Sequence, residues 1–129
     1  LGPAHVAVAT TLTHLAKLYA TSGHLHQATS LLQRALLIRE KALGPEHLVV
    51  ATSLHNLAVL YLKERQYAKG EPLFVRALAI QEKTLGVAHP SVARTLEHYA
   101  RLMRETGRPE PAAQLDTRAQ MIRDQISPR

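Results

Sequence analysis

Hydrophobic residues recur along this chain at the spacing of amphipathic helices. In the middle of the chain the positions i, i+3, i+4 and i+7 of one segment are Leu54, Leu57, Ala58 and Tyr61. Residues at this spacing share one face of a helix, which we expect to run from about 46 to 63. A second helix should follow, from about 67 to 84, with its inward positions at Gly70, Leu73, Phe74, Ala77 and Ile80.

The whole chain consists of three copies of this helix pair. Leu1-Gly2-Pro3, Leu43-Gly44-Pro45 and Leu85-Gly86-Val87 are separated by a constant step of 42 residues, and the copies align without a gap. A fixed period in this range predicts stacked units, each of which buries its apolar face only against a neighbour. We therefore expect one all-α solenoid domain of six helices, with repeats at about 1–42, 43–84 and 85–126.

The two outer repeats follow the same pattern with informative differences. Their first helices have these inward positions: Val8, Leu12, Leu15, Ala16 and Tyr19, then Val92, Leu96, Tyr99, Ala100 and Met103. In the last helix, 109–126, Asp116 and Gln120 replace the apolar residues of the earlier copies. A terminal repeat is polar on its outer side, so we interpret this helix as a cap and the chain as the C-terminal part of a longer array.

Residues after the first helices predict how those helices end. Gly23 and Gly107 are suited to the left-handed backbone that commonly ends a helix, whereas the middle repeat has Arg65 in that slot. A left-handed arginine costs about 1 kcal/mol. Pro72 lies inside the fourth helix, where it removes one backbone hydrogen bond.

Composition narrows the class of protein without defining its role. The 129 residues are 46% hydrophobic and 20% charged, which is ordinary for a folded domain. The net charge of +6 favours acidic partners. The absence of cysteine excludes disulfides and thiol chemistry and suits a cytoplasmic protein. No apolar run is long enough to span a membrane, so we expect no membrane partner.

The eight histidines raise the question of a metal site. His5, His47 and His89 share one repeat position, so they are about one repeat apart and too distant for one ion. We expect them to form the turn before each first helix instead. The pair His24 and His26 has no carboxylate or cysteine nearby in the sequence. We assign neither a metal site nor a cofactor.

No arrangement of residues points to catalysis. The chain has no nucleophile elbow and no glycine-rich phosphate loop, so we expect no catalytic residues, no small-molecule substrate and no enzymatic activity. Nucleic acid is disfavoured as a partner because Tyr19, Tyr61 and Tyr99 lie on or beside the core stripe, where they cannot stack on bases. Arg34, Arg76 and Arg118 recur in one slot, and we expect them to tie neighbouring repeats together.

The spacing resembles that of a known repeat family. Leu54, Leu57, Ala58 and Tyr61, followed by Gly70, Phe74 and Ala77, resemble the tetratricopeptide signature, which usually has a period of about 34 residues. The longer period, the LGPEH linker and the segment RALAIQEK are similar to repeats of kinesin light chains and nephrocystin-3. This resemblance implies a right-handed superhelix, a concave groove lined by the first helices, capture of short peptide segments, and no catalysis. The ligands of kinesin light chains are often acidic segments around an aromatic residue.

The helix geometry indicates which residues would line that groove. On each first helix, a stripe about 160° from the core stripe is left uncovered, at about 100° per residue. The candidates for binding a peptide are Thr10, Thr13, His14, Lys17, Thr52, His55, Asn56, Val59, Lys63, Arg94, His98 and Arg101. Glu97 and Glu105 lie on the same stripe and would partly offset its positive charge.

For one position on this stripe we have the strongest reason to expect contact with a bound peptide. Asn56 matches the groove asparagine of kinesin light chains and other peptide-clamping members, and its amide can pair with both groups of a bound backbone. His14 and His98 occupy the same slot in the other repeats, which could make binding depend on pH.

We predict an interaction module, with a scaffold or adaptor role, that binds a protein or peptide partner of acidic character. The alternatives are a structural spacer in a larger signalling or transport protein, and a basic surface that binds nucleic acid. Self-association is a further one, because Val6, Val8 and Leu12 would be partly uncovered if no helix precedes them.

Overall fold

The computed structural model describes residues 3–126, which form six α-helices joined by short turns. The helices are α1 (Pro3–Thr21), α2 (Leu25–Leu43), α3 (Leu48–Lys63), α4 (Tyr67–Leu85), α5 (Pro90–Glu105) and α6 (Pro109–Ile126). No strand occurs within this range, so the predicted all-α class is confirmed. The expected boundaries hold to within two residues, the largest difference being that α3 begins at Leu48 rather than at residue 46.

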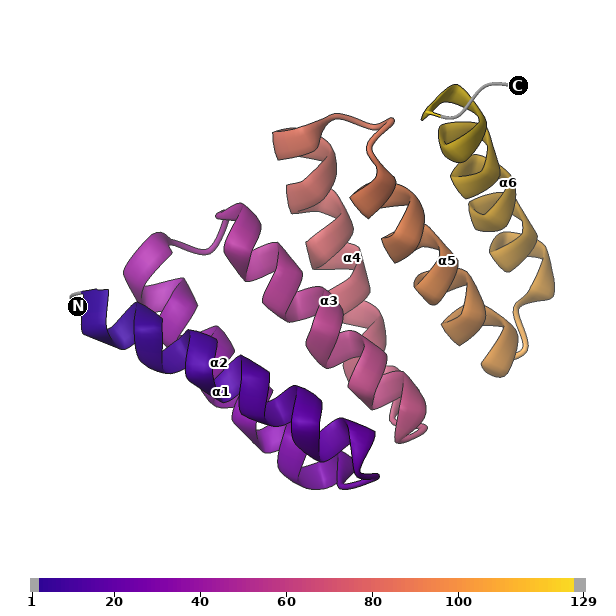
Figure 1. Ribbon diagram of the computed structural model, residues 1–129. Helices are drawn as coiled ribbons and strands as arrows, with labels where there is room; N and C mark the ends of the chain where they lie inside the picture. The colour runs from indigo at the N-terminus through magenta and orange to yellow at the C-terminus, as the bar shows by residue number, and fades with distance from the viewer. Residues whose placement is uncertain (1–2, 127–129) are drawn as a thin grey trace.

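The helices stack in chain order as antiparallel pairs (Figure 1). The helices of each pair pack on each other, and α2 and α4 also pack on α3 and α5, the first helices of the next repeats. In Figure 1 α2 and α4 lie behind α1 and α3, so the first helices share one side of the molecule. This arrangement is the stacking that the period of 42 residues predicted.

The core lies along the seams where consecutive helices meet. In the middle repeat every predicted inward residue of α3 is buried, at positions Val50, Leu54, Leu57, Ala58 and Tyr61. The seam partners from α2 are Ala28, Leu32 and Leu36. Phe74 of α4 is fully buried beside Leu102 of α5. Burial of these side chains contributes roughly 1.5–3 kcal/mol for each large one.

Three of the predicted inward residues of α1 are exposed instead. Val8 is 44% exposed, whereas Val50 at the same repeat position is fully buried, and Leu15 and Tyr19 are exposed as well. The cause is that α2 covers this face of α3, while nothing among residues 3–126 covers it on α1. The exposure of Val8 agrees with the expectation that it would be partly uncovered, whereas Leu12 is buried against Ala35, so that expectation is wrong for Leu12.

The helix ends follow the predicted backbone pattern. The φ angles of Gly23, Arg65 and Gly107 are 83°, 60° and 77°, and each residue follows the C-cap of a first helix. At the arginine, the Arg65 amide donates to the Leu62 carbonyl at 3.1 Å and the Gln66 amide donates to the Tyr61 carbonyl at 2.8 Å. These two bonds define a Schellman motif, which satisfies carbonyls at the end of α3.

Two of the three repeated histidines begin helices as expected. Nδ1 of His47 accepts a hydrogen bond from the Val49 amide, and Nδ1 of His89 accepts one from the Ser91 amide, both at 3.0 Å. These bonds satisfy amides that have no partner within the first turn of a helix. The expectation is wrong for His5, which lies inside α1.

Polar side chains tie successive repeats together at fixed positions. Arg76 pairs with Glu40 at 2.8 Å, and the equivalent Arg118 pairs with Glu82 at 3.0 Å, which confirms the role expected for these two arginines. A second pair of repeat positions forms a buried hydrogen bond, in which the Arg39 guanidinium donates to the Ser53 hydroxyl at 2.7 Å. In the next seam Gln81 and Thr95 occupy these same positions.

The last helix buries less than its counterparts. Its buried residues are Ala112, Ala119 and Ile122. Gln120 is exposed, and Asp116 pairs with Arg104 of α5, both at positions where α2 and α4 have apolar residues. This polarity agrees with the pattern expected for a cap, and the position of α6 at the end of an array stays a prediction.

The left-handed arginine yields a test of the helix ends. Arg65→Gly should raise the free energy of unfolding by up to about 1 kcal/mol, because glycine adopts this backbone without the steric cost. Gly23→Arg, at the matched position, should lower it by a similar amount, since a Cβ there contacts nothing and only the backbone term changes. Urea denaturation of both variants gives the values, and changes of the same sign would contradict the assignment.

Candidate functional site

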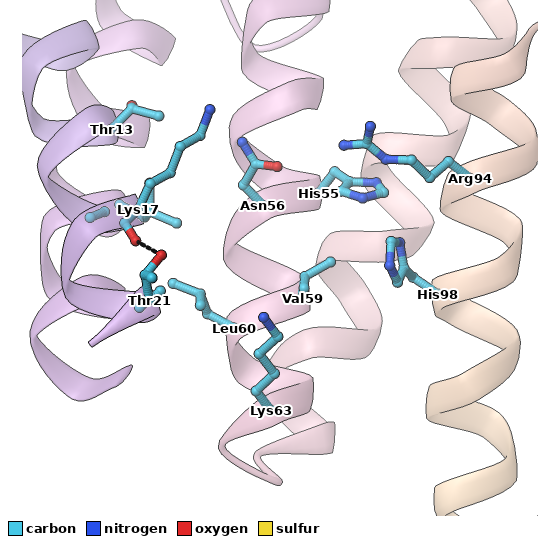
Figure 2. A pocket seen from close by; sticks show the side chains of 13 residues that line it. Thr13, Lys17, Thr21, His55, Asn56, Val59, Leu60, Lys63, Arg94 and His98 are labelled. Atoms are coloured by element: carbon cyan, nitrogen blue, oxygen red, sulfur yellow. Dashed lines mark hydrogen bonds between the residues drawn. The ribbon is translucent and has the colours of Figure 1, made fainter. Parts of the chain in front are cut away.

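A cavity of about 550 Å³ opens between α1, α3 and α5 (Figure 2). Its lining combines side chains from the predicted groove stripes of these helices with buried side chains, one of them from α2. The lining residues are Thr13, Ala16, Lys17, Ala20, Thr21, Leu32, His55, Asn56, Val59, Leu60, Lys63, Arg94 and His98. A cavity of this size falls within the range of ligand sites.

The cavity has an apolar floor because two alanines of α1 leave space. Ala16, Ala20, Leu32 and Leu60 supply this floor between α1 and α3. Ala20 stands at the repeat position that Leu62 fills in α3, so α1 carries the smaller side chain at this position. We did not predict these floor residues from the sequence, although the small residue at this slot was the available signal.

Positive charge is concentrated around the cavity. Figure 2 shows Lys17 on α1, Lys63 on α3 and Arg94 on α5, one cation from each of three repeats. Among the described residues, no aspartate or glutamate lines the cavity. Glu97 was expected to offset the charge, but it forms an ion pair with Arg123 of α6 at 2.6 Å instead. The hydrogen bond from Arg123 holds the pKa of Glu97 below its ordinary value.

The structure brings most of the predicted groove residues together. Eight of the twelve line the cavity: Thr13, Lys17, His55, Asn56, Val59, Lys63, Arg94 and His98. Thr52 lies in an adjoining polar cleft of about 180 Å³, and Arg101 lies in a separate hollow beside Lys63. Thr10 and His14 line none of these spaces. That the set binds a peptide stays a prediction.

Two of these residues are more buried than we expect for side chains on an uncovered helix face. His55 is only 4% exposed, and Thr13 is buried with its hydroxyl donating to the Ala9 carbonyl at 2.8 Å. The expectation that both lie on an uncovered face is wrong, because the repeat position that they share faces the neighbouring repeat. His55 therefore forms part of the seam between α3 and α5 and also part of the cavity wall.

The surroundings of His55 define its protonation state. The Thr95 hydroxyl has two acceptors, Gln81 Oε1 at 2.7 Å and the Ser91 carbonyl at 3.1 Å. With its proton donated to either one, its oxygen accepts from His55 Nδ1, at 2.8 Å. The proton of the neutral ring is therefore on Nδ1, and Nε2 is an acceptor. His55 Nε2 is buried and has no hydrogen-bond partner.

A second histidine contacts this ring. The centroid of His98 lies 5.0 Å from that of His55, with the ring planes at 78°. Phe74 contacts His55 edge-on and is stacked on His98, so an apolar ring borders both imidazoles. Figure 2 shows His55, His98 and Arg94 together at the α5 side of the cavity.

Burial and neighbouring charge keep both rings neutral near pH 7. Burial, the adjacent His98 and the charge of Arg94 lower the pKa of His55 to about 3. The pKa of His98 is also lowered, mainly by burial and then by the charge of Arg94. At constant pH near 7, a neutral pair of this kind gains a proton only if its surroundings change.

Comparison with known proteins identifies the repeats. The tetratricopeptide repeat family matches residues 7–69 and 50–125, which together span most of the sequence. The chain belongs to the tetratricopeptide repeat family. Members of this family generally mediate protein–protein interactions, typically without catalysis. A search of the curated proteins finds no match.

Solved structures agree with this assignment. The chain is similar to BtubC (BKLC) from P. vanneervenii, with a TM-score of 0.86 and 24% identity over 95% of this chain and 49% of that one. It is also similar to a putative kinesin light chain of Podosopora anserina with nearly identical TPR-like repeats. The TM-score is 0.79, with 28% identity over 99% of this chain and 59% of that one. The N-terminal domain of stress-induced protein-1 from C. elegans has a TM-score of 0.72, with 15% identity over 94% of this chain and 88% of that one.

These matches show tetratricopeptide repeats of the kinesin-light-chain-like kind, as the sequence predicted. The chain spans about half the length of the first two matched chains. Within residues 3–126, no helix combines the length and apolar character needed to cross a membrane. The same part of the domain has no group of three or more metal-binding side chains.

The buried histidine predicts how the stability of the domain depends on pH. As the pH falls below about 6.5, the unfolded chain protonates His55 while the folded chain resists until pH near 3. The free energy of unfolding should therefore decrease, by about 1.4 kcal/mol per pH unit for this group. The decrease is largest on the acid side of pH 6.5 and is absent above it.

A substitution isolates this contribution. His55→Gln keeps a hydrogen-bonding group near Thr95 but does not titrate, so the slope of stability between pH 7 and 5 should become shallower. This window lies above the ordinary pKa of 4.5 of Glu71 and Glu97, whose pKa values are lowered further by Arg108 and Arg123. His26→Gln, on an exposed site, is the control, and an unchanged slope in His55→Gln would contradict the prediction.

Proposed function

We propose that this domain binds an acidic segment of a partner protein in the cavity between α1, α3 and α5. The observation that carries the proposal is the charge of the lining, which has three cations and, among the described residues, no carboxylate. Because the cations come from three helices, a ligand would have to extend across the repeats to reach all of them. The role that follows is that of a cytoplasmic scaffold or adaptor.

The floor and the amide of Asn56 suit a peptide rather than a simple anion. The apolar floor offers a place for one aromatic or aliphatic side chain, and its burial would add roughly 1.5–3 kcal/mol. Asn56 is half-buried at the centre of the lining, between Lys17 and Arg94 (Figure 2). Its amide can donate to and accept from the backbone of an extended segment.

Nucleic acid fits this surface less well. Binding of single strands depends on aromatic side chains that stack on bases. Tyr61 is buried, and Tyr99 is stacked on Phe74 with its hydroxyl bound to Glu71 at 2.9 Å. Neither ring is available to a base. Tyr19 is exposed, so the expectation that its ring cannot stack on a base is wrong, but neither Tyr19 nor any other tyrosine of the described residues lines the cavity. Retention of an oligonucleotide at low salt, without binding of acidic peptides, would favour nucleic acid instead.

Substitution of two lining residues tests the proposal. Asn56→Ala combined with Lys63→Ala should weaken binding of an acidic peptide with one central tryptophan by about tenfold to a hundredfold. The amide contributes about 1–3 kcal/mol if its partner groups lose a hydrogen bond, and an exposed cation adds up to about 1 kcal/mol. Fluorescence anisotropy of a labelled peptide measures the dissociation constant.

A matched double variant provides the control. Lys41→Ala with Gln125→Ala removes one ammonium and one amide from exposed positions outside the cavity, so the affinity should stay near that of the wild type. Equal binding by the wild type and Asn56→Ala/Lys63→Ala would place the site elsewhere. Failure of acidic peptides to bind at any salt concentration would leave the spacer role as the better description.

A further inference from the structure

The seam between α3 and α5 contains an arrangement that the binding of an acidic segment does not by itself require. His55 and His98 are in contact, and both line the cavity. His55 Nε2 is buried without a hydrogen-bond partner. Unpartnered buried polar atoms carry an energetic cost, and in native proteins each one calls for an explanation. Here the nitrogen belongs to one of two contacting imidazole rings, each of which can gain a proton.

The polar cleft beside His55 has the composition of an anion site. It is lined by Thr52, His55, Asn56, Gln81, Ser91 and Arg94, all of which are polar. His55 and Arg94 also line the larger cavity, so the cleft is continuous with the proposed peptide site. Gln81 and His55 are both 4% exposed, so these two residues form a desolvated part of the wall, whereas Thr52 and Arg94 are exposed.

We propose that a carboxylate of the bound peptide occupies this cleft beside Arg94, and that His98 takes up one proton from solvent as the carboxylate enters. The inference rests on the proposed binding of an acidic segment. His98 is half-buried and borders the cavity, whereas His55 is almost completely buried, so His98 is the ring that solvent protons reach.

The electrostatic reason lies in the residues that surround His98. On α5 its neighbours are Arg94, Glu97 and Arg101, and the two arginines oppose a charge on the ring. Glu97 favours that charge, but its carboxylate is engaged by Arg123 of α6. A ligand carboxylate on Arg94 would neutralise the nearer opposing charge and add an attractive one.

Among the residues that the structure describes, the other helices around the pair supply no second anion. On α3 the neighbour is His55, which is neutral, and Lys63 lines the same cavity. α4 contributes Phe74, which is stacked on the His98 ring. Lys17 of α1 is a cation across the cavity. The carboxylate of the ligand is therefore the group that would convert the pair from neutral to singly protonated.

Proton uptake makes the affinity depend on pH in a defined direction. Because the bound state holds one more proton, the affinity should rise as the pH falls from about 8 to about 5.5, by about tenfold for a shift of one pKa unit. A peptide whose carboxylates stay ionised throughout this range contributes nothing to the slope.

Calorimetry measures the proton directly. A blocked, histidine-free acidic peptide is titrated into the full domain in two buffers of different ionisation enthalpy, near pH 6.5. The wild type should take up a substantial fraction of one proton per peptide bound. The same peptide with its acidic residues replaced by glutamine and asparagine should bind more weakly, and the binding that remains at higher peptide concentration should cause no uptake, which identifies the carboxylate as the cause.

The repeats provide the variants. His98→Asn installs the residue that α3 has in this slot, so it should fold, bind the peptide with an affinity independent of pH, and take up no proton. His14→Asn makes the same exchange on α1, outside the cavity, and should keep the uptake of the wild type. A ¹⁵N-histidine NMR titration of the unaltered domain gives an independent readout, with the His98 resonances shifting toward imidazolium when peptide is added at constant pH.

The outcomes separate the two proposals. Peptide binding without proton uptake, or equal uptake in the wild type and His98→Asn, would overturn the proton-coupled site and leave the binding site standing. Absence of peptide binding in the wild type at every pH would overturn the proposed function and, with it, this inference. Uptake that is lost in His98→Asn and retained in His14→Asn supports the proposal.

Discussion

The structure depends on one packing relation, in which the second helix of each repeat covers one face of the first helix of the next. α2 covers the face of α3 that carries Val50 and Leu54, and α4 does the same for α5. The exposed Val8 on α1 shows what that face looks like when no helix covers it. Because only one face of α3 and α5 is used in this way, the opposite stripe stays available to line a cavity.

The seams that hold the repeats together also reach the candidate site. Thr95 links Gln81 of α4 to His55 of α3 through one hydroxyl, and His55 is at the same time part of the cavity wall. The position equivalent to Thr95 is Ser53, whose partner Arg39 is a buried cation rather than an amide. The two seams therefore share a geometry but differ in charge, and only the second one includes a histidine pair.

Periodicity in the sequence was sufficient to predict most of the fold. A step of 42 residues without gaps established six helices, their order and their turns, including the left-handed backbone at Arg65. The exposure of Leu15 and Tyr19 was not predictable from the periodicity, because it depends on a neighbouring helix rather than on the residue itself. The site was predicted in outline, since a stripe 160° from the core identified most of its residues. The burial of His55 was missed because helical angle alone does not say how closely the next helix approaches.

The three cations of the cavity come from three different repeats, and this distribution has a mechanical consequence. In a stack of repeats each unit contacts only its neighbours, so α1 and α5 influence each other only through what lies between them. A polypeptide that reached Lys17, Lys63 and Arg94 together would join the outer units directly. It would restrict the motion of the outer repeats relative to each other, so the domain with bound peptide would be more rigid than the free domain.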